Sequence, residues 1–168
     1  MFQLRNHQNT VIDILNKNRK GQIIVPTGGG KTMCMIEDAI YQFKSSPKTI
    51  VVVAPRILLA EQLSSEFLEI LDNVSVMHVH SGETTHFSST KASDVCMWDR
   101  YTRGDKIIFT TYHSLHRIQE SCIHVDTIYF DEAHNAIQSN FIEAVEYSQY
   151  MQIDVTSLQQ HQNILTHL

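Results

Sequence analysis

Short runs of apolar residues alternate with longer amphipathic stretches along this chain of 168 residues. The apolar runs predict strands over 22–25, 49–53, 74–79, 106–110, 127–130 and 151–155. Stretches with apolar side chains every three or four residues predict helices over 7–18, 31–43, 57–71, 92–101, 113–120 and 141–150.

Alternating strands and helices predict βαβ units with right-handed crossovers and a parallel sheet that helices cover on both faces. The run 49–53 is apolar at nearly every position, which is typical of a strand buried on both faces. Ligands of such sheets bind at the carboxyl ends of the strands. The residues that directly follow each predicted strand are therefore the candidates for function.

The composition is that of a globular domain, with 42% hydrophobic and 18% charged residues. No apolar run approaches the roughly 20 residues of a membrane span, and no export signal precedes the first helix. We therefore expect an intracellular, soluble chain that is neither secreted nor bound to a membrane. The net charge of −5 gives no electrostatic support for nucleic-acid binding, which has to come from specific residues.

A glycine-rich segment, Val25-Pro26-Thr27-Gly28-Gly29-Gly30-Lys31-Thr32, separates the first predicted strand from the second helix. Consecutive glycines let backbone N–H groups approach an anion, and the helix N-terminus adds a positive dipole end. Lys31 can reach the β- and γ-phosphates of a nucleotide, and the Thr32 hydroxyl can bind Mg²⁺. The general pattern has glycine five residues before Gly30, where this chain has Val25.

Two adjacent carboxylates, Asp131 and Glu132, follow the apolar strand 127–130. Asp131 is expected to hold Mg²⁺ across from Thr32, and Glu132 to orient and deprotonate the attacking water. Parallel strands would bring Asp131 close to Lys31 despite the 100 positions between them. The alternative is an aspartate that caps the following helix.

The segments 26–32 and Asp131-Glu132-Ala133-His134 together resemble the first of the two RecA-like domains of superfamily-two helicases, of the DEAD/DEAH and type III restriction-enzyme kind. The resemblance covers about residues 2–147, with further matching segments at 4–8, 53–62 and 110–115. It implies a P-loop NTPase, RecA-like α/β domain with three αβα layers and a mostly parallel central sheet. We place this ATP-binding domain at 1–155 and leave 156–168 unassigned.

The resemblance also implies ATP and Mg²⁺ as cofactors and a role for each matching position. The residues expected to bind the nucleotide are Gln8, Arg5, Thr27, Gly28, Gly29, Gly30, Lys31 and Thr32. Lys31, Asp131 and Glu132 are expected to be catalytic, with Thr32 and Asp131 on the metal. Arg56 and Thr111 are expected to contact nucleic acid, and His134 to couple the nucleotide site to its neighbours.

The implied function is that of the ATP-binding lobe of an ATP-dependent helicase or translocase, with DNA favoured over RNA. Two family features are missing from the sequence: the Ser/Thr-Ala-Thr motif, where 153–157 reads Ile-Asp-Val-Thr-Ser, and a second RecA-like lobe with its arginine finger. We therefore expect weak ATP binding and slow hydrolysis unless a partner or a longer product supplies that lobe. The alternatives are a nucleotide-dependent nucleic-acid-binding module or truncated lobe without motor activity, and a small P-loop kinase.

Two other groups of side chains carry an expectation. His78 and His80 share a face of a predicted strand and could form a zinc site with His86 or Cys96, although their spacing fits no established zinc pattern. A second group on the predicted helix 92–101 and just after it comprises Trp98, Arg100, Tyr101 and Arg103. It could stack on a single strand, but helix packing of the aromatic rings is favoured.

Overall fold

The computed structural model of the chain describes residues 5–18, 21–25, 28–132 and 152–157. The helices are α1 (Asn6–Lys17), α2 (Lys31–Phe43), α3 (Ile57–Leu68), α4 (Ala92–Tyr101) and α5 (Leu115–Glu120), with a 3₁₀ turn η1 (Tyr112–Ser114). The strands are β1 (Gly21–Val25), β2 (Thr49–Ala54), β3 (Ser75–Val79), β4 (Phe87–Ser88), β5 (Lys106–Thr111), β6 (Thr127–Asp131) and β7 (Gln152–Ser157).

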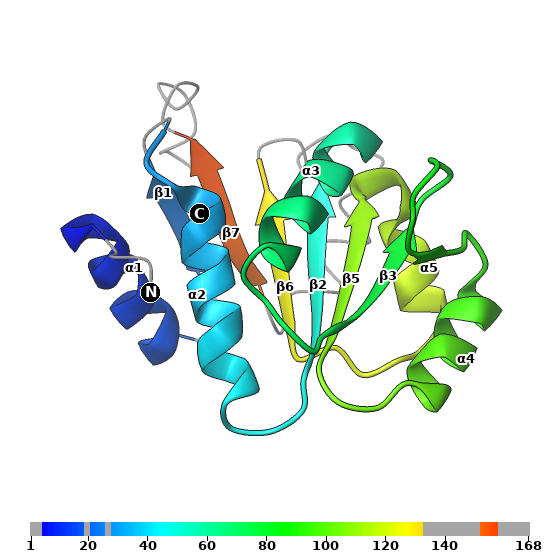
Figure 1. Ribbon diagram of the computed structural model, residues 1–168. Helices are drawn as coiled ribbons and strands as arrows, with labels where there is room; N and C mark the ends of the chain where they lie inside the picture. The colour runs from blue at the N-terminus through cyan, green and yellow to red at the C-terminus, as the bar shows by residue number, and fades with distance from the viewer. Residues whose placement is uncertain (1–4, 19–20, 26–27, 133–151, 158–168) are drawn as a thin grey trace.

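These strands form one sheet in the order β1-β7-β6-β2-β5-β3-β4, and every neighbouring pair is parallel. The predicted α/β fold with a mostly parallel sheet is thus confirmed. All carboxyl ends meet at one edge, so the segments after β1, β2, β3, β5 and β6 lie along the same side of the molecule (Figure 1). β7 lies between β1 and β6, which places one strand between the glycine-rich segment and the acidic pair.

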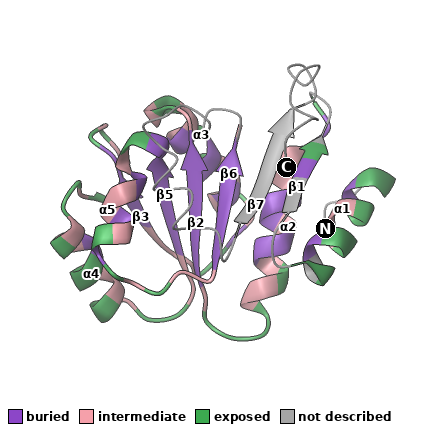
Figure 2. Cartoon of the chain, turned by 180° about the vertical axis from the view of Figure 1, so that it is seen from behind, coloured by how far each residue is buried: buried purple, intermediate pink, exposed green. Residues whose placement is uncertain are grey.

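Apolar side chains alternate between the two faces of the sheet and build two cores. On β2, Ile50, Val52 and Ala54 belong to the core beneath α1, α2 and α3, whereas Val51 and Val53 belong to the core beneath α4 and α5. All six residues of β2 are buried, which confirms the prediction of a strand buried on both faces. Figures 1 and 2 show the resulting three layers from opposite sides.

Two predicted helix boundaries are wrong because of tertiary packing, and one short strand was not predicted. The helix predicted over 57–71 ends at Leu68, and the apolar pattern runs on because Ile70 and Leu71 pack on the core after the helix has ended. The helix predicted over 113–120 opens with the 3₁₀ turn, whose Tyr112 is held against β6 by a hydrogen bond to the Asp131 carbonyl oxygen. The two-residue strand β4 was not predicted, because its pairing with β3 leaves no periodic pattern.

Some of the remaining predicted elements are confirmed, and others lie outside the described residues. Helices α2 and α4 have the predicted bounds, and β7 confirms a strand near 151–155. The helix predicted over 141–150 and the tail after Ser157 lie outside the described residues, so the domain boundary stays a prediction. Among the described helices, none has the length and apolar character that a bilayer span requires.

Candidate nucleotide site

The glycine-rich segment forms a tight turn between β1 and α2. Gly28 and Gly30 have left-handed backbones, with φ of 73° and 77°, which residues with a Cβ rarely adopt. Gly30 is the residue before the first turn of α2, so Lys31 and Thr32 begin the helix. The first N–H groups of a helix have no carbonyl partner within it, which makes this turn a candidate site for anions.

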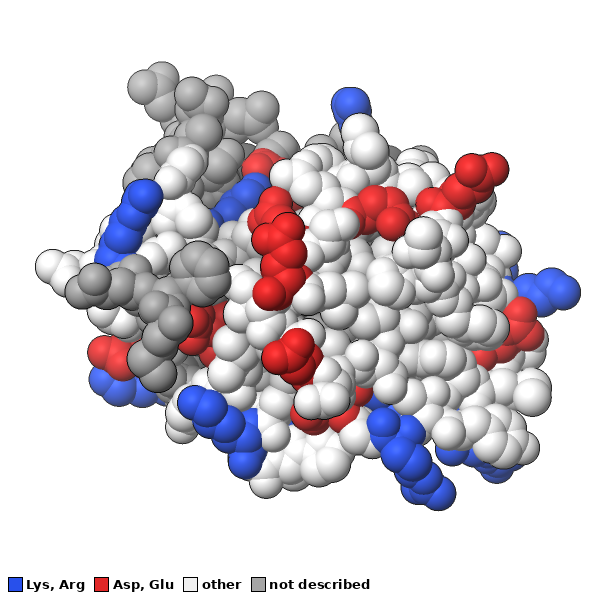
Figure 3. Space-filling view, viewed as in Figure 1, with Lys and Arg blue, Asp and Glu red and all other residues white. Residues whose placement is uncertain are grey.

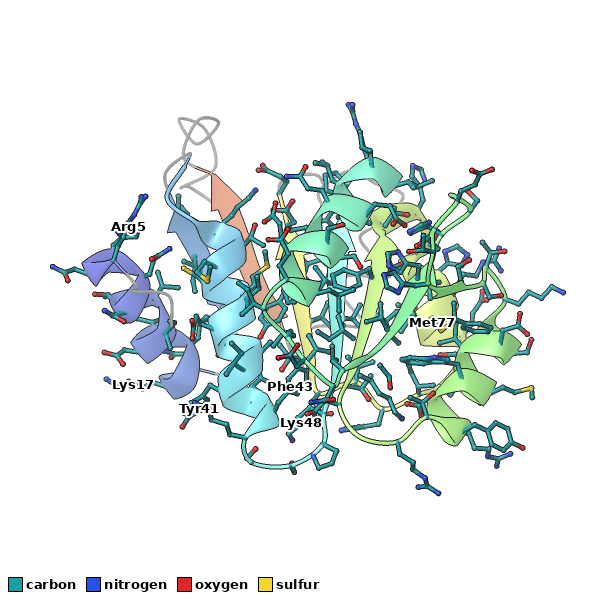
Figure 4. All side chains as sticks on the ribbon, in the orientation of Figure 1. Arg5, Lys17, Tyr41, Phe43, Lys48 and Met77 are labelled. Carbon is teal, nitrogen blue, oxygen red and sulfur yellow. The ribbon has the colours of Figure 1, made fainter. Side chains whose placement is uncertain are left out.

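The start of α1 packs against this turn. The Gln8 side chain is buried, and its Nε2 lies 3.4 Å from the carbonyl oxygens of both Gly29 and Gly30. A Cβ on Gly30 would stand 2.4 Å from that Nε2, so the contact requires glycine. His7 Nε2 lies 2.9 Å from the Gly29 carbonyl oxygen, and Arg5 Nη1 donates to Gly28 at 3.5 Å (Figure 4 labels Arg5).

The structure therefore brings both predicted residues, Arg5 directly before α1 and Gln8 on it, to the glycine-rich turn. Sequence reasoning gave His7 no role, although it lies between them in the matching segment. Its position inside that segment was the signal that could have indicated a contact with the turn.

Lys31 lies between the two carboxylates that follow β6. Its Nζ is 2.6 Å from Asp131 Oδ1 and 2.5 Å from Glu132 Oε1. The predicted juxtaposition of Lys31 with the acidic pair is thus present in the fold. The Asp131 residue is only 4% exposed, and its Oδ1 receives no hydrogen bond of good geometry from the described residues.

A buried polar network fixes the rotation of α2 about its axis. Tyr129 donates its hydroxyl to Asp38 Oδ2 at 2.5 Å, Gln42 donates to the same oxygen at 2.6 Å, and Thr127 donates to Gln42 Oε1. Asp38 and Gln42 follow Lys31 by seven and eleven positions, so the three residues share one helix face. The network ties that face to β6 and thereby aims Lys31 at Asp131.

Sequence reasoning missed this network. The signal for it was an aspartate on a largely apolar helix, seven residues after Lys31. Burial raises the pKa of Asp38, and the hydrogen bonds from Tyr129 and Gln42 oppose that rise only in part. A second missed contact is the Tyr112 hydroxyl, which donates to the Asp131 carbonyl oxygen at 3.0 Å.

The charges of the site depend on one another. Burial lowers the pKa of Lys31, but the hydrogen bonds and charges of Asp131 and Glu132 outweigh it and raise that pKa above its usual value. Burial raises the pKa of Asp131 by more than Lys31 lowers it. Glu132 has a left-handed backbone with φ of 54°, an uncommon conformation that often marks functional positions. The Lys31 ammonium group is therefore the positive charge beside the buried carboxyl group of Asp131.

The other predicted site residues lie at the same sheet edge or outside the described residues. Arg56 is exposed directly before α3, and Thr111 ends β5 beside Ala54 but is only 5% exposed. Thr32 is half-buried in the first turn of α2. Thr27 and His134 lie outside the described residues, and their predicted roles stay predictions.

The aromatic group on α4 divides in the structure. Trp98 packs against the core beneath α4 and α5, as the favoured interpretation predicted, whereas Tyr101 is 75% exposed.

Comparison with known families decides the relationship. The sequence profile of the family described as "Type III restriction enzyme, res subunit" matches residues 1–161. The chain belongs to this family. This confirms the resemblance to superfamily-two helicases on which the predicted fold and site rest. A comparison with curated protein sequences gave no match.

Solved structures with this fold come from restriction enzymes and helicases. The domain superposes on a nuclease-deletion mutant of the Type ISP restriction-modification enzyme LlaGI, in complex with a DNA substrate mimic, with TM-score 0.76, 21% identity and coverage of 93% of this chain and 17% of LlaGI. It superposes on the UvsW helicase from bacteriophage T4 with TM-score 0.72 and 12% identity, covering 92% of this chain and 52% of UvsW. For the Pyrococcus furiosus Hef helicase domain the TM-score is 0.67 and the identity 21%, with coverage of 91% of this chain and 32% of that structure.

These likenesses establish the RecA-like fold of the res-family domain. The chain spans between 17% and 52% of the length of these three relatives.

Proposed function

We propose that this res-family domain is the ATP-binding lobe of an ATP-dependent helicase or translocase. The observation that carries the proposal is the contact of Lys31 with both Asp131 and Glu132, at 2.6 Å and 2.5 Å, beside a glycine-rich helix start. In this arrangement the lysine is a cation for phosphate, the aspartate is a ligand for a metal ion, and the glutamate is a base for water.

The residues present fit a magnesium–triphosphate. The buried Asp131 Oδ1 lacks a well-oriented hydrogen-bond donor among the described residues, and a carboxylate oxygen is the ligand that Mg²⁺ prefers. Beyond its chain neighbours, no atom of the described residues lies within 4 Å of the position that a Cβ of Gly28 would take, which leaves space at this part of the turn. When bound, Mg²⁺ would neutralise negative charge on the phosphate oxygens.

Lys31 is the group that changes partners in this proposal. Phosphate oxygens at the start of α2 compete with the two carboxylates for its ammonium group. After that exchange, Asp131 no longer shares its Oδ1 with Lys31 and can hold the metal. Glu132 no longer shares its Oε1 with Lys31 and can accept a proton from the attacking water.

A second RecA-like lobe, in a partner or in a longer product, would complete the site. The residue expected from it is an arginine finger, which raises phosphoryl-transfer rates by ~10³–10⁵. Movement along a strand also requires two lobes that open and close. We therefore propose slow hydrolysis for this lobe by itself.

Nucleic acid, with DNA favoured over RNA, is the proposed track. Arg56 is exposed at the carboxyl edge of the sheet, and Thr111 ends a strand of the same edge with little exposed surface. On the face shown in Figure 3, acidic side chains lie across the middle and basic ones mainly near the rim. With a net charge of −5, binding would depend on a few placed contacts rather than on a basic surface.

The proposal is tested by titrating Mg²⁺ and a fluorescent ATP analogue into the wild-type chain and two lysine variants. Lys31→Ala is expected to weaken binding by about 10–100-fold, because it removes a charge-assisted contact to phosphate. Lys44→Ala is the matched control, since Lys44 is exposed at the other end of α2. Unchanged affinity in Lys31→Ala would refute the nucleotide site.

A lobe that binds nucleotide without motor activity is the second candidate, and the contact of Lys31 with the proposed base Glu132 favours it. The ATPase rate with and without single-stranded DNA or RNA separates the two. Stimulation by one of these strands supports a motor lobe and identifies the track. Nucleotide binding with no turnover under any condition supports the binding module.

A further inference from the structure

Three side chains away from the nucleotide site converge at the carboxyl end of β3. Glu61 projects from α3, His78 lies on β3 and His80 follows it. Glu61 Oε1 is 2.9 Å from His78 Nδ1 and 3.1 Å from His80 Nε2, and the two ring nitrogens are 3.0 Å apart. His78 directly follows Met77, which Figure 4 labels.

A hydrogen bond sets the tautomer of His80. The Gly82 amide donates to His80 Nδ1 at 3.2 Å, so the neutral His80 ring carries its proton on Nε2, which lies 3.0 Å from His78 Nδ1 and 3.1 Å from Glu61 Oε1. His78 Nε2 lies 3.0 Å from Ser64 Oγ, a hydroxyl that can either accept from this nitrogen or donate to it. When Ser64 accepts, the lone pair of His78 is on Nδ1, beside Glu61 Oε1 and His80 Nε2.

Glu61 Oε1, His78 Nδ1 and His80 Nε2 lie close to one another, and each is an atom type that binds divalent metal ions. Among the described residues, no lysine or arginine forms an ion pair with Glu61.

We infer that Glu61, His78 and His80 form a binding site for a divalent transition-metal ion, zinc above all, that is separate from the nucleotide site. Two imidazoles and one carboxylate form a ligand set typical of zinc sites with an open position. The three ligand atoms form a nearly equilateral triangle with sides of 2.9, 3.1 and 3.0 Å. An ion about 2 Å from all three atoms, the usual zinc distance, fits just outside the plane of this triangle.

The surroundings of the triangle fit such an ion. With an ion on Nδ1, His78 Nε2–H would donate to Ser64 Oγ, 3.0 Å away, and this bond would orient the ring as second partners of metal-bound histidines do. The Glu61 side chain is 29% exposed while His78 is fully buried, so solvent reaches the cluster from the side of α3. Among the described residues the group has these three members, which leaves the fourth position to water.

The structure corrects the ligand set that the sequence suggested. Glu61, seventeen positions before His78, completes the triangle in place of His86 or Cys96. The His86 ring stacks parallel on the His78 ring at 5.3 Å, with its plane only 5° away, and Cys96 is exposed on α4.

Metal binding has a local consequence at Gly82. When His80 binds an ion through Nε2, its proton moves to Nδ1, which can then no longer accept the Gly82 amide hydrogen. The 3.2 Å hydrogen bond breaks and the turn after β3 has to shift. Space there is tight, since a Cβ on Gly82 would stand 2.3 Å from Ile57 Cγ2 at the start of α3. The ion therefore couples this turn to the helix that follows Arg56.

The test is a titration of the metal-stripped chain with Zn²⁺ by calorimetry and with Co²⁺ by visible absorption, in nucleotide-free buffer. We expect one ion per chain and the intense d–d absorption of a four-coordinate Co²⁺ site. Glu61→Gln and His80→Asn are each expected to weaken binding by about 100-fold or more. His124→Asn is the matched control, because this side chain is 78% exposed. The Gly82 amide resonance is expected to move on addition of Zn²⁺ in the wild-type chain.

Circular dichroism of each variant in the absence of metal shows whether it has folded. If His80→Asn does not fold, Glu61→Gln decides by itself, because its side chain keeps its size at a partly exposed position. Absence of binding to the wild-type chain would overturn the inference, as would equal affinity in the wild type and Glu61→Gln. Since no nucleotide is present, neither result depends on the proposed ATP function.

Discussion

The nucleotide site and the histidine cluster of Glu61, His78 and His80 lie at the same edge of one sheet, yet their charges are balanced in opposite ways. In the first, Lys31 lies within 2.6 Å of two carboxylates, so the cation is part of the protein. In the second, Glu61 lies beside the rings of His78 and His80, and no lysine or arginine of the described residues pairs with it. We therefore propose that the first site exchanges its own cation for phosphate and metal, whereas the second takes up a cation from solution.

The largest effect in this comparison is expected from Glu132, the proposed base. Glu132→Gln keeps the size of the side chain but removes the base, so ATP hydrolysis should fall by about 10²–10⁴-fold with little change in nucleotide affinity. Single-turnover hydrolysis and equilibrium binding measure the two effects separately. Glu120→Gln, an exposed glutamate on α5, is the control. A wild-type rate in Glu132→Gln would remove Glu132 from the proposed mechanism.

A smaller effect is expected on the free energy of unfolding, which compares the charge balance of the two sites directly. Lys31→Met leaves Asp131 and Glu132 without their shared cation and should lower the free energy of unfolding by about 1–3 kcal/mol. Glu61→Gln in buffer with a chelator removes the charge of a partly exposed carboxylate that pairs with no lysine or arginine of the described residues, so it should change stability by less than about 1 kcal/mol. Urea unfolding at pH 7 measures both variants.

The double variant Lys31→Met with Glu132→Gln is the control for this comparison and should regain part of the loss. Equal losses in Lys31→Met and Glu61→Gln would mean that the two sites do not differ in charge balance.

The smallest effect comes from a structural ion pair at the opposite edge of the sheet. Asp126 accepts hydrogen bonds from Lys48 Nζ and the Thr49 amide, both at 2.9 Å. Burial raises the pKa of Asp126, but these bonds outweigh it and lower that pKa below 3.8. The stabilisation is therefore present above this value and is lost as the pH falls through the lowered pKa.

Asp126→Asn should accordingly destabilise the chain by about 1 kcal/mol at pH 7, and the difference from wild type should shrink towards pH 3. Urea unfolding of both proteins at the two pH values measures it. A difference that grows on acidification would contradict the assigned direction.

Most of the candidate nucleotide site could be predicted from the sequence because its residues form two runs of adjacent residues. Gly28, Gly29, Gly30 and Lys31 form one continuous turn, and Asp131 and Glu132 end one strand. Parallel strands that end at one edge were sufficient to expect that the two segments meet. The resemblance named Arg5 and Gln8 as nucleotide-binding residues, but it predicted neither their contacts with the turn nor any role for His7.

The contacts that hold the site in place could not be predicted in this way. The Asp38–Tyr129 hydrogen bond joins residues 91 positions apart, and neither residue belongs to a motif. Which face of α2 turns towards β6 depends on how the helix packs, and periodicity alone does not show which strand lies beneath it.

The sequence by itself determined the α/β class, the position of most elements and the residues of the phosphate turn and the acidic strand end. These features depend on local patterns of apolar residues and on motifs of adjacent residues, which are visible without a fold. The tertiary structure decided which distant groups share a charge: Lys31 with Asp131 and Glu132, and Glu61 with His78 and His80. The physical reason is that electrostatic balance depends on distances of about 3 Å and on burial, which strand order and helix rotation set together.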